Sequence, residues 1–348
     1  MGDVSNYDYE LPEELIAQRP LAVRSDARLL VVDRQADTIE HYHVRDLPEL
    51  LAPPDALIVN DSRVVAARLI GFRTQTGGKW EGLFLSADPQ GRWRLLGKTG
   101  GRIRPGEMVT LVDRAGREHG RLVLVSQEQG GVWTAVPEMH GEAAAILDEV
   151  GRVPLPCYIR DGEMLPEDVT RYQTVYAERP GSAAAPTAGL HLTRELLAKL
   201  ESAGVAVGRV TLHVGLDTFR PISGENLAEH TMHSEEYEIG QHTADLVRRT
   251  RAAGGRVVAV GTTSVRVLET AAAGGDVAAG GGATRLFIRP PYTFRAVDAL
   301  ITNFHLPRST LLVLVRTFGG DALIMRAYEE AIAERYRFYS YGDAMLIR

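Results

Sequence analysis

Two different hydrophobic patterns follow each other along these 348 residues, and their order restricts the fold. Beyond residue 180, apolar segments such as 256–261 and 298–303 each lead through a polar loop into a helical pattern. Thr193 precedes another helical pattern, which ends at Gly204. Continuously apolar strands that alternate with helices predict an α/β fold, in which a mostly parallel sheet has helices on its faces.

The segment from residue 63 to residue 137 has a different pattern. Short apolar stretches alternate there with Gly-rich turns, among them 74–79 and 113–120. Strands separated by such turns about every ten residues are typical of a small antiparallel β-barrel or sandwich. We therefore predict a discontinuous α/β domain of residues 1–63 and 148–348, interrupted by an inserted antiparallel β-barrel domain at 64–147.

The predicted barrel also differs from the rest of the chain in charge. Residues 64–136 contain eleven Arg and Lys against six Asp and Glu, a net charge of about +5, whereas the whole chain carries −6. A chain that is acidic overall is a poor candidate for coating nucleic acid in general. The sequence thus predicts a basic module within an acidic protein.

Composition and the N-terminal segment predict a soluble cytoplasmic protein. No apolar run approaches the length that spans a bilayer, and the first ten residues are acidic, unlike a signal peptide. The single cysteine, Cys157, cannot form a disulfide within the chain. We expect a cytoplasmic monomer.

Four segments carry polar residues and glycines where strands are predicted to end: 181–191, 211–219, 261–266 and 302–310. Ligands of open α/β sheets bind beyond the carboxyl ends of the strands, where helix N-termini point N–H groups outward. We therefore predict that the four segments share a ligand pocket. A structural interpretation stays open for each, because hydroxyls at 262–264 can cap a helix and His213 can be a hydrogen-bonded interior residue.

The histidines indicate a second class of chemistry. His230 and His233 lie three residues apart beside carboxylates, and His213 and His305 could converge on them. A metal-dependent hydrolase that uses these four side chains is therefore an alternative. The sequence contains no HExxH motif, no cysteine pair, and no nucleotide-binding or serine-hydrolase motif. It predicts neither a metal nor a bound cofactor.

Several segments together resemble the S-adenosylmethionine:tRNA ribosyltransferase-isomerase family of queuosine biosynthesis. In chain order they are NDSRVVAARL (60–69), RYQTVYAERPGS (171–182), AAPTAGLH (184–191), TLHVG (211–215), HTMHSEEYEI (230–239), VGTTSVRVLE (260–269), LITNFHLPRSTLL (300–312) and RYRFYSYGDAMLI (335–347). The chain departs from the family at Leu216 and Asp217, where a small residue and a glycine are expected, so the loop geometry there stays open.

The resemblance implies that S-adenosylmethionine donates a ribosyl group. This group is transferred to 7-aminomethyl-7-deazaguanine at the wobble position of the tRNA anticodon and isomerised, which gives epoxyqueuosine and releases adenine and methionine. S-adenosylmethionine is then a consumed co-substrate, no cofactor is implied, and tRNA is the macromolecular partner. A non-catalytic RNA-binding protein is a further alternative, because the predicted barrel is basic.

This reaction suggests roles for individual residues. A base must remove the proton next to the sulfonium, and an acid must protonate the departing adenine. We predict that His213 and His233 supply these groups and that Glu235 or Asp343 orients one of them.

Binding residues are predicted in both domains. We expect the methionyl carboxylate at Thr262, Thr263 and Arg266, and the adenine against residues 186–189. The full predicted substrate-binding set is Pro186, Thr187, Gly189, His191, Asp217, His230, Thr262, Thr263, Arg266, Asn303 and His305. The predicted tRNA contacts of the barrel are Arg92, Arg94, Arg102 and Arg104.

Overall fold

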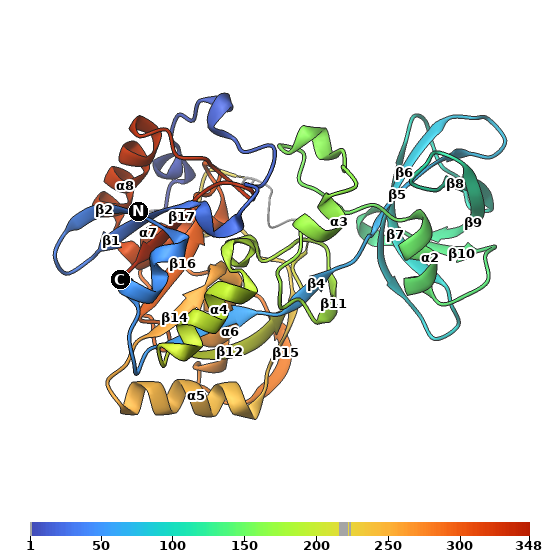
Figure 1. Ribbon diagram of the computed structural model, residues 1–348. Helices are drawn as coiled ribbons and strands as arrows, with labels where there is room; N and C mark the ends of the chain where they lie inside the picture. The colour runs from blue at the N-terminus through green and yellow to red at the C-terminus, as the bar shows by residue number, and fades with distance from the viewer. Residues whose placement is uncertain (1, 216–221, 223) are drawn as a thin grey trace. The chain divides into compact units, whose positions relative to one another are not determined.

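The computed structural model describes residues 2–215, 222 and 224–348. The described chain divides into two compact units (Figure 1). The first comprises Met1–Arg63, Tyr158–Asp161 and Arg171–Arg348, and the second comprises Val64–Cys157 and Gly162–Thr170.

The first unit is built on one mixed β-sheet, to which nine strands of the described chain belong. Its four central strands are parallel to one another: β12 (Ala206–Leu212), β3 (Ala56–Asn60), β14 (Val257–Val260) and β16 (Ala299–Asn303). Strand β17 (Ala344–Ile347) is parallel to β1 (Arg28–Asp33), whereas the other neighbouring pairs are antiparallel. The α/β class with a parallel core is thus confirmed. In spatial order the strands are β15 (Gly280–Thr284), β13 (Glu235–Ile239), β12 (Ala206–Leu212), β3 (Ala56–Asn60), β14 (Val257–Val260), β16 (Ala299–Asn303), β17 (Ala344–Ile347), β1 (Arg28–Asp33) and β2 (Thr38–His43).

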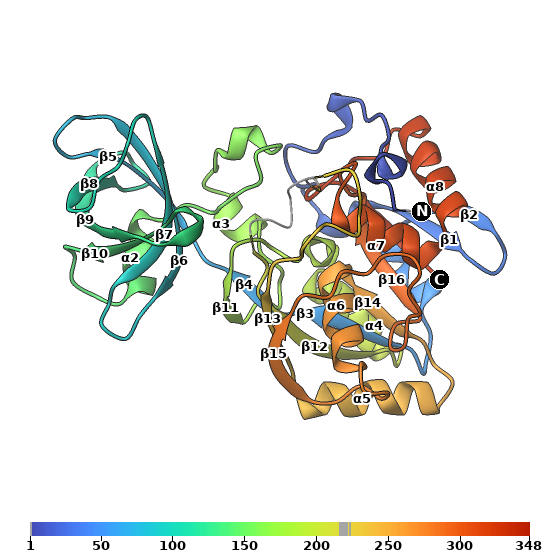
Figure 2. The same cartoon turned by 180° about the vertical axis from the view of Figure 1, so that it is seen from behind.

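Helices cover both faces of this sheet because the central strands are apolar on both sides. In β3, Ile58 belongs to one hydrophobic core, and Leu57 and Val59 belong to the other. The helices of the first core are α5 (Gln241–Ala252), α6 (Gly261–Ala271), α7 (Thr310–Gly319) and α8 (Asp321–Ala333), of which α6 and α7 lie in front of the sheet in Figure 2. The helices of the second core are α1 (Leu47–Leu50) and α4 (Arg194–Ser202). Thr193 caps α4 by accepting a hydrogen bond from the Leu196 amide, as its position in the sequence predicts.

Short elements connect these layers. The 3-10 helices are η1 (Val4–Tyr7), η2 (Glu13–Leu15), η3 (Arg24–Asp26), η4 (Val44–Asp46), η6 (Arg160–Gly162) and η7 (Thr187–His191). Strand β11 (Arg179–Ser182) pairs with β4 (Ser62–Val64), and α3 spans Asp168–Arg171.

The second unit contains a closed antiparallel barrel, as the Gly-rich turns predict. Its core is filled by aromatic and aliphatic side chains, among them Trp80, Trp93 and Trp133. A Cβ atom at Gly82 would lie 2.1 Å from the Trp80 ring, so this strand position must be a glycine for the indole to fit. The strands are β5 (Arg68–Arg73), β6 (Lys79–Ala87), β7 (Trp93–Thr99), β8 (Glu107–Val112), β9 (Glu118–Gln127) and β10 (Val132–Pro137), with η5 (Gln129–Gly131) before β10.

Helix α2 (Ala143–Val150) follows the barrel and is packed into its core. The buried side chains of Ile146, Leu147 and Val150 make this contact. The predicted boundary after residue 147 therefore falls inside a helix of the second unit. The helical pattern that follows the predicted strands belongs to the helix that covers the barrel, and it does not mark the return to the α/β domain. Within the described residues, no helix combines the length and the apolar character that a bilayer span needs.

Candidate functional site

A pocket lies at the carboxyl ends of the central strands of the first unit. Its walls surround about 530 Å³ of empty space, part of which is open solvent. All four predicted strand-end segments contribute to its wall: residues 185–188, Val214, residues 261–263 and residues 302–306. The structure thus brings these segments together, as the sequence predicts.

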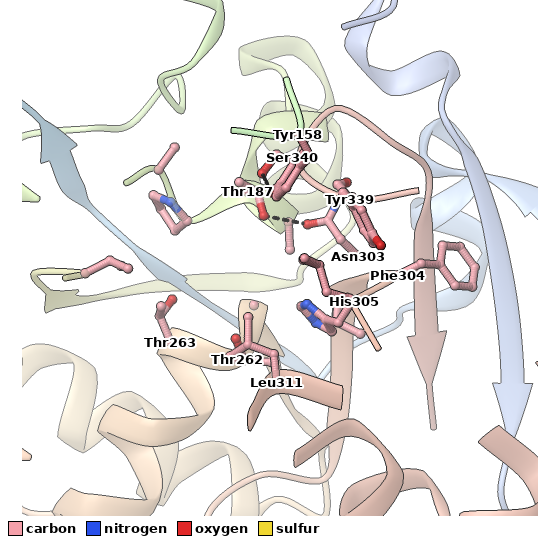
Figure 3. Close-up of a pocket in the computed structure, with 17 residues that line it drawn as sticks. Tyr158, Thr187, Thr262, Thr263, Asn303, Phe304, His305, Leu311, Tyr339 and Ser340 are labelled. Atoms are coloured by element: carbon pink, nitrogen blue, oxygen red, sulfur yellow. Dashed lines mark hydrogen bonds between the residues drawn. The ribbon is translucent and has the colours of Figure 1, made fainter. Parts of the chain in front are cut away.

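The N-terminus of α6 forms one side of the pocket (Figure 3). Gly261 takes a φ of +85°, which turns the chain sharply from β14 into the helix. The hydroxyl of Ser264 donates to the Val260 carbonyl at 2.8 Å, whereas the hydroxyl of Thr263 is buried and has no hydrogen-bond partner among the described residues. The positive end of the helix dipole and an unused hydroxyl make this side suitable for an anionic group.

Asn303, the last residue of β16, joins two of the surrounding segments, 187–191 and 339–343. Its Oδ1 accepts a hydrogen bond from the Thr187 hydroxyl at 2.8 Å, which Figure 3 shows as a dashed line. Its Nδ2 lies 3.3 Å from His191 Nε2, 3.3 Å from the Tyr339 carbonyl oxygen and 3.4 Å from the Asp343 carbonyl oxygen. Asn303 therefore fixes the relative positions of the loops that end in the pocket.

Two of the predicted histidines are buried and electrically neutral near pH 7. Burial lowers the pKa of His305 to about 3, and its Nε2 lies 2.7 Å from the Thr302 hydroxyl. Burial, together with the nearby Arg337 guanidinium, lowers the pKa of His191 to about 4. His305 lines the pocket, whereas His191 lies behind Asn303 and outside the lining. Such neutral rings hold loops by hydrogen bonds and are poor proton carriers at this pH.

Gly189 allows a close approach within the protein. A Cβ atom at this position would lie 1.9 Å from the Tyr176 hydroxyl oxygen. Gly189 is not part of the pocket lining, whereas the neighbouring Pro186, Thr187 and Ala188 are. The absence of a side chain at Gly189 therefore makes room for Tyr176.

Arg266 and Glu235 form a buried ion pair one helical turn beyond Thr262. Their side chains are 5% and 6% exposed, and Arg266 Nη1 contacts Glu235 Oε2. Arg266 Nε donates to the Leu286 carbonyl at 3.1 Å, and the Gly215 amide donates to Glu235 Oε1 at 3.0 Å. Arg266 is thus turned toward Glu235 and does not belong to the pocket lining, which differs from its expected place at the ligand. Its Nη2 is buried without a partner in the described part of the chain.

The predicted catalytic histidines lie outside the pocket lining. His213 is half-buried, its Nδ1 has no partner among described residues, and its ring packs against Gly181. The ring of His230 lies edge-on to Phe287 at 5.4 Å, and burial and the neighbouring His233 lower its pKa. His233 itself is exposed.

Asp343 has a bracing role in the described structure. Its Oδ1 accepts the Arg28 amide at 3.0 Å, and its Oδ2 accepts the Arg337 amide at 2.8 Å. These contacts fasten the loop before β17 to the beginning of β1, and neither His213 nor His233 takes part in them. Asp217 lies outside the residues that the structure describes.

The four histidines of the hydrolase alternative do not assemble into a metal site here. Within the described ranges, no group of three or more His, Cys, Asp or Glu side chains is placed to hold a metal ion. His305 instead uses Nε2 for the bond to Thr302, and His230 packs on Phe287.

The predicted tRNA contacts of the barrel fall into two pairs. Arg92 and Arg94 are each bound to a carboxylate, that of Asp88 at 2.7 Å and that of Glu128 at 2.9 Å. Arg102 and Arg104 are exposed in the segment between β7 and β8, and among described residues no carboxylate forms an ion pair with either. The second pair therefore offers more uncompensated charge.

Four side chains of the pocket wall lie outside the predicted segments, and one of them is Leu311, which directly follows the segment 302–310. Tyr158, Tyr339 and Ser340 line the cavity together with the predicted residues (Figure 3). Tyr339 and Ser340 lie in the segment 335–347, which resembles the family but ends no predicted strand of the pocket. Tyr158 follows Cys157 in a stretch for which the sequence predicts no site.

Comparison with known proteins identifies the relatives of this chain. A family model described as "Queuosine biosynthesis protein" matches residues 4–347. The chain belongs to this family. Two members are an S-adenosylmethionine:tRNA ribosyltransferase-isomerase of Symbiobacterium thermophilum, 52% identical with 99% of each chain covered, and one of Staphylococcus saprophyticus, 46% identical with the same coverage.

A solved structure of the family agrees in fold. It is the crystal structure of an S-adenosylmethionine tRNA ribosyltransferase from Thermotoga maritima, 36% identical to this chain, with a TM-score of 0.57. The comparison covers 99% of this chain and 100% of the Thermotoga protein. Both units of the present structure thus have a counterpart in a solved member of the family.

Proposed function

We propose that this protein transfers and isomerises the ribosyl group of S-adenosylmethionine onto 7-aminomethyl-7-deazaguanine in the tRNA anticodon. The product is epoxyqueuosine in tRNA, and adenine and methionine are released. The proposal depends on one observation: relatives named S-adenosylmethionine:tRNA ribosyltransferase-isomerase are about 50% identical to this chain over 99% of its length. The pocket at the sheet edge supplies a site of suitable chemistry.

The donor binds in this pocket with its methionyl carboxylate at the N-terminus of α6. Support comes from the unused Thr263 hydroxyl and from the backbone N–H groups of the first helical turn. Arg266 stabilises this end indirectly, since its ion pair with Glu235 holds β13 and the Gly215 amide beside the helix. The predicted adenine position against residues 186–189 uses the side of the pocket that carries small side chains, and residues 186–188 of this stretch belong to the lining.

The proton transfers require a base at the carbon next to sulfur and an acid at the departing adenine. We assign them to His213 and His233. The low pKa values of His191 and His305 favour this assignment, because a ring that stays neutral above about pH 4 is a weak proton donor near neutrality. Of the two predicted orienting carboxylates we keep Glu235, because both oxygens of Asp343 accept backbone amides and neither ring takes part in these contacts.

The barrel contacts the tRNA through Arg102 and Arg104, and more weakly through Arg92 and Arg94, whose charges are compensated. We further propose that the protein acts as a cytoplasmic monomer without a resident cofactor. Light scattering of the purified protein at micromolar concentration tests the oligomeric state.

The deciding experiment is incubation of the protein with S-adenosylmethionine and tRNA that carries 7-aminomethyl-7-deazaguanine. Release of adenine in proportion to modified tRNA supports the proposal. The same tRNA with guanine at the wobble position is the control, because it lacks the aminomethyl nucleophile. Tight tRNA binding without adenine release would instead favour the non-catalytic RNA-binding alternative.

A further inference from the structure

An aromatic wall closes one part of the pocket. The rings of Tyr158 and Tyr339 both line it, with centroids 4.8 Å apart and planes inclined by 58°. The hydroxyl oxygens of Tyr158 and Ser340 lie 2.7 Å apart and share a hydrogen bond, drawn as a dashed line in Figure 3. Tyr158 is therefore held at its hydroxyl end by Ser340 and along its ring by Tyr339. A ring fixed in this way loses little further freedom when a ligand stacks on it.

The backbone of Tyr339 is strained in a manner that keeps its ring at the pocket. Its φ is +69°, in the left-handed region that bulky side chains rarely adopt. Three hydrogen bonds fix this conformation: the Tyr339 amide donates to the Phe304 carbonyl, and the Tyr339 carbonyl accepts from the Gly342 amide and from Asn303 Nδ2. Strained residues persist where their surroundings over-determine them, and they are concentrated at ligand sites.

The rest of the pocket lining has the character that a flat heteroaromatic ring requires. The seventeen residues that line the cavity in the described structure include no Asp, Glu, Lys or Arg. Its apolar part includes Ala185, Pro186 and Leu311, and the unpaired hydroxyl of Thr263 is available for a hydrogen bond. An uncharged pocket with an aromatic wall and a few polar groups is typical of sites for small heterocyclic ligands.

We propose that Tyr158, supported by Tyr339 and Ser340, is the stacking surface for the adenine ring of the donor. This inference rests on the proposed function, which supplies S-adenosylmethionine as the ligand. The fused ring of the tRNA deazaguanine has the same stacking chemistry, so the test must separate the two rings. The proposal extends the sequence-based prediction that the adenine lies against residues 186–189, because residues 185–188, Tyr158 and Tyr339 line the same cavity.

The test compares Tyr158→Leu, which removes the ring, with Tyr158→Phe, which keeps the ring and removes the hydroxyl. Affinities for S-adenosylmethionine and for an anticodon stem-loop carrying the deazaguanine are measured separately by calorimetry. We expect Tyr158→Leu to weaken donor binding about tenfold or more and Tyr158→Phe to weaken it no more than about threefold. Binding of the stem-loop should remain unchanged in both. Tyr42→Leu serves as the control, since Tyr42 is also half-buried but does not line the pocket.

Wild-type donor affinity in Tyr158→Leu would overturn the proposal. Weakened stem-loop binding with unchanged donor binding would also overturn it, because the wall would then receive the base of the tRNA. Tyr339→Asn gives a second measurement, since asparagine tolerates the left-handed conformation and removes the ring. It should fold, as its melting curve will show, and lose donor affinity.

The binding test of Tyr158 gives an answer whether or not the proposed reaction takes place. A wild-type protein that binds S-adenosylmethionine but releases no adenine would contradict the proposed function. The role of Tyr158 in stacking would still be decided by the donor affinities of the wild type and Tyr158→Leu. A wild-type protein that releases adenine, together with a fully active Tyr158→Leu variant, would contradict only the stacking wall.

Discussion

At the scale of single residues, some polar side chains at the site already form hydrogen bonds within the protein, whereas others have polar atoms without a partner among the described residues. Asn303 and His305 are engaged with neighbouring loops and hold the shape of the cavity. The Thr263 hydroxyl and His213 Nδ1 are buried and have no partner among the described residues. Because an unpaired buried polar atom is costly, we expect a bound ligand to satisfy the Thr263 hydroxyl, which lines the pocket, whereas His213 lies outside the lining.

Thr263→Val tests the carboxylate site, because valine has nearly the shape of threonine and lacks its hydroxyl. A hydrogen bond to a charged group contributes about 1.5–3 kcal/mol, so we expect KM for S-adenosylmethionine to rise about tenfold or more. Steady-state kinetics at saturating tRNA measure this change. Thr317→Val on α7 is the control, since its hydroxyl donates to the Val313 carbonyl within the helix and it does not line the pocket. Equal KM values in the wild type and Thr263→Val would place the carboxylate elsewhere.

His213→Ala and His233→Ala test the proton transfers. A positioned acid or base contributes about 10²–10⁴-fold to a rate, so each variant should lose activity on this scale while its melting temperature stays close to that of the wild type. Exchange of the hydrogen next to sulfur with solvent deuterium identifies the base directly. The assignment fails if both variants exchange this hydrogen at the wild-type rate.

At the scale of elements, the sequence predicts which strand-end loops meet at the pocket, but it does not predict which side chains contact each other there. Glycines and hydroxyls after apolar strands pointed to residues 185–188, 261–263 and 302–306, because the carboxyl edge of an α/β sheet is where such loops meet. The partner of Arg266 lies 31 residues earlier on β13, and only the antiparallel pairing of β12 with β13 brings Glu235 to α6. Tyr158 and Tyr339 are 181 positions apart and become neighbours only through tertiary packing.

The far end of α6 depends on a second buried carboxylate. Glu269 accepts the amides of Arg295, Ala296 and Val297, all within 3.2 Å, as well as the Tyr292 hydroxyl at 3.1 Å. Glu269→Gln replaces one acceptor oxygen with a donor that faces these N–H groups. We expect a loss of about 1–3 kcal/mol in the free energy of unfolding, measured by urea denaturation. Glu238→Gln, at an exposed position of β13, should change it by less than about 0.5 kcal/mol. A midpoint equal to that of the wild type would show that Glu269 is dispensable.

At the scale of the whole molecule, the division of charge predicted from the sequence acquires a structural meaning. The basic excess of residues 64–136 belongs to the strands and turns of one closed barrel, whereas the ligand pocket is built from the other unit. The sequence could predict the excess but not which arginines are compensated, because the ion pairs with Asp88 and Glu128 depend on the turns and strand register of the barrel.

The barrel arginines allow a matched test of tRNA binding. Counterion release makes affinity depend on salt in proportion to the number of phosphates contacted, so Arg102→Gln with Arg104→Gln should weaken tRNA binding and flatten its salt dependence by roughly one to two units of slope. Arg92→Gln with Arg94→Gln should leave the slope nearly unchanged, since these two guanidinium groups are already bound to carboxylates. Affinity for S-adenosylmethionine should stay at the wild-type value in both double variants, because the donor pocket lies in the other unit. Identical slopes for both double variants and the wild type would exclude these four arginines from phosphate binding.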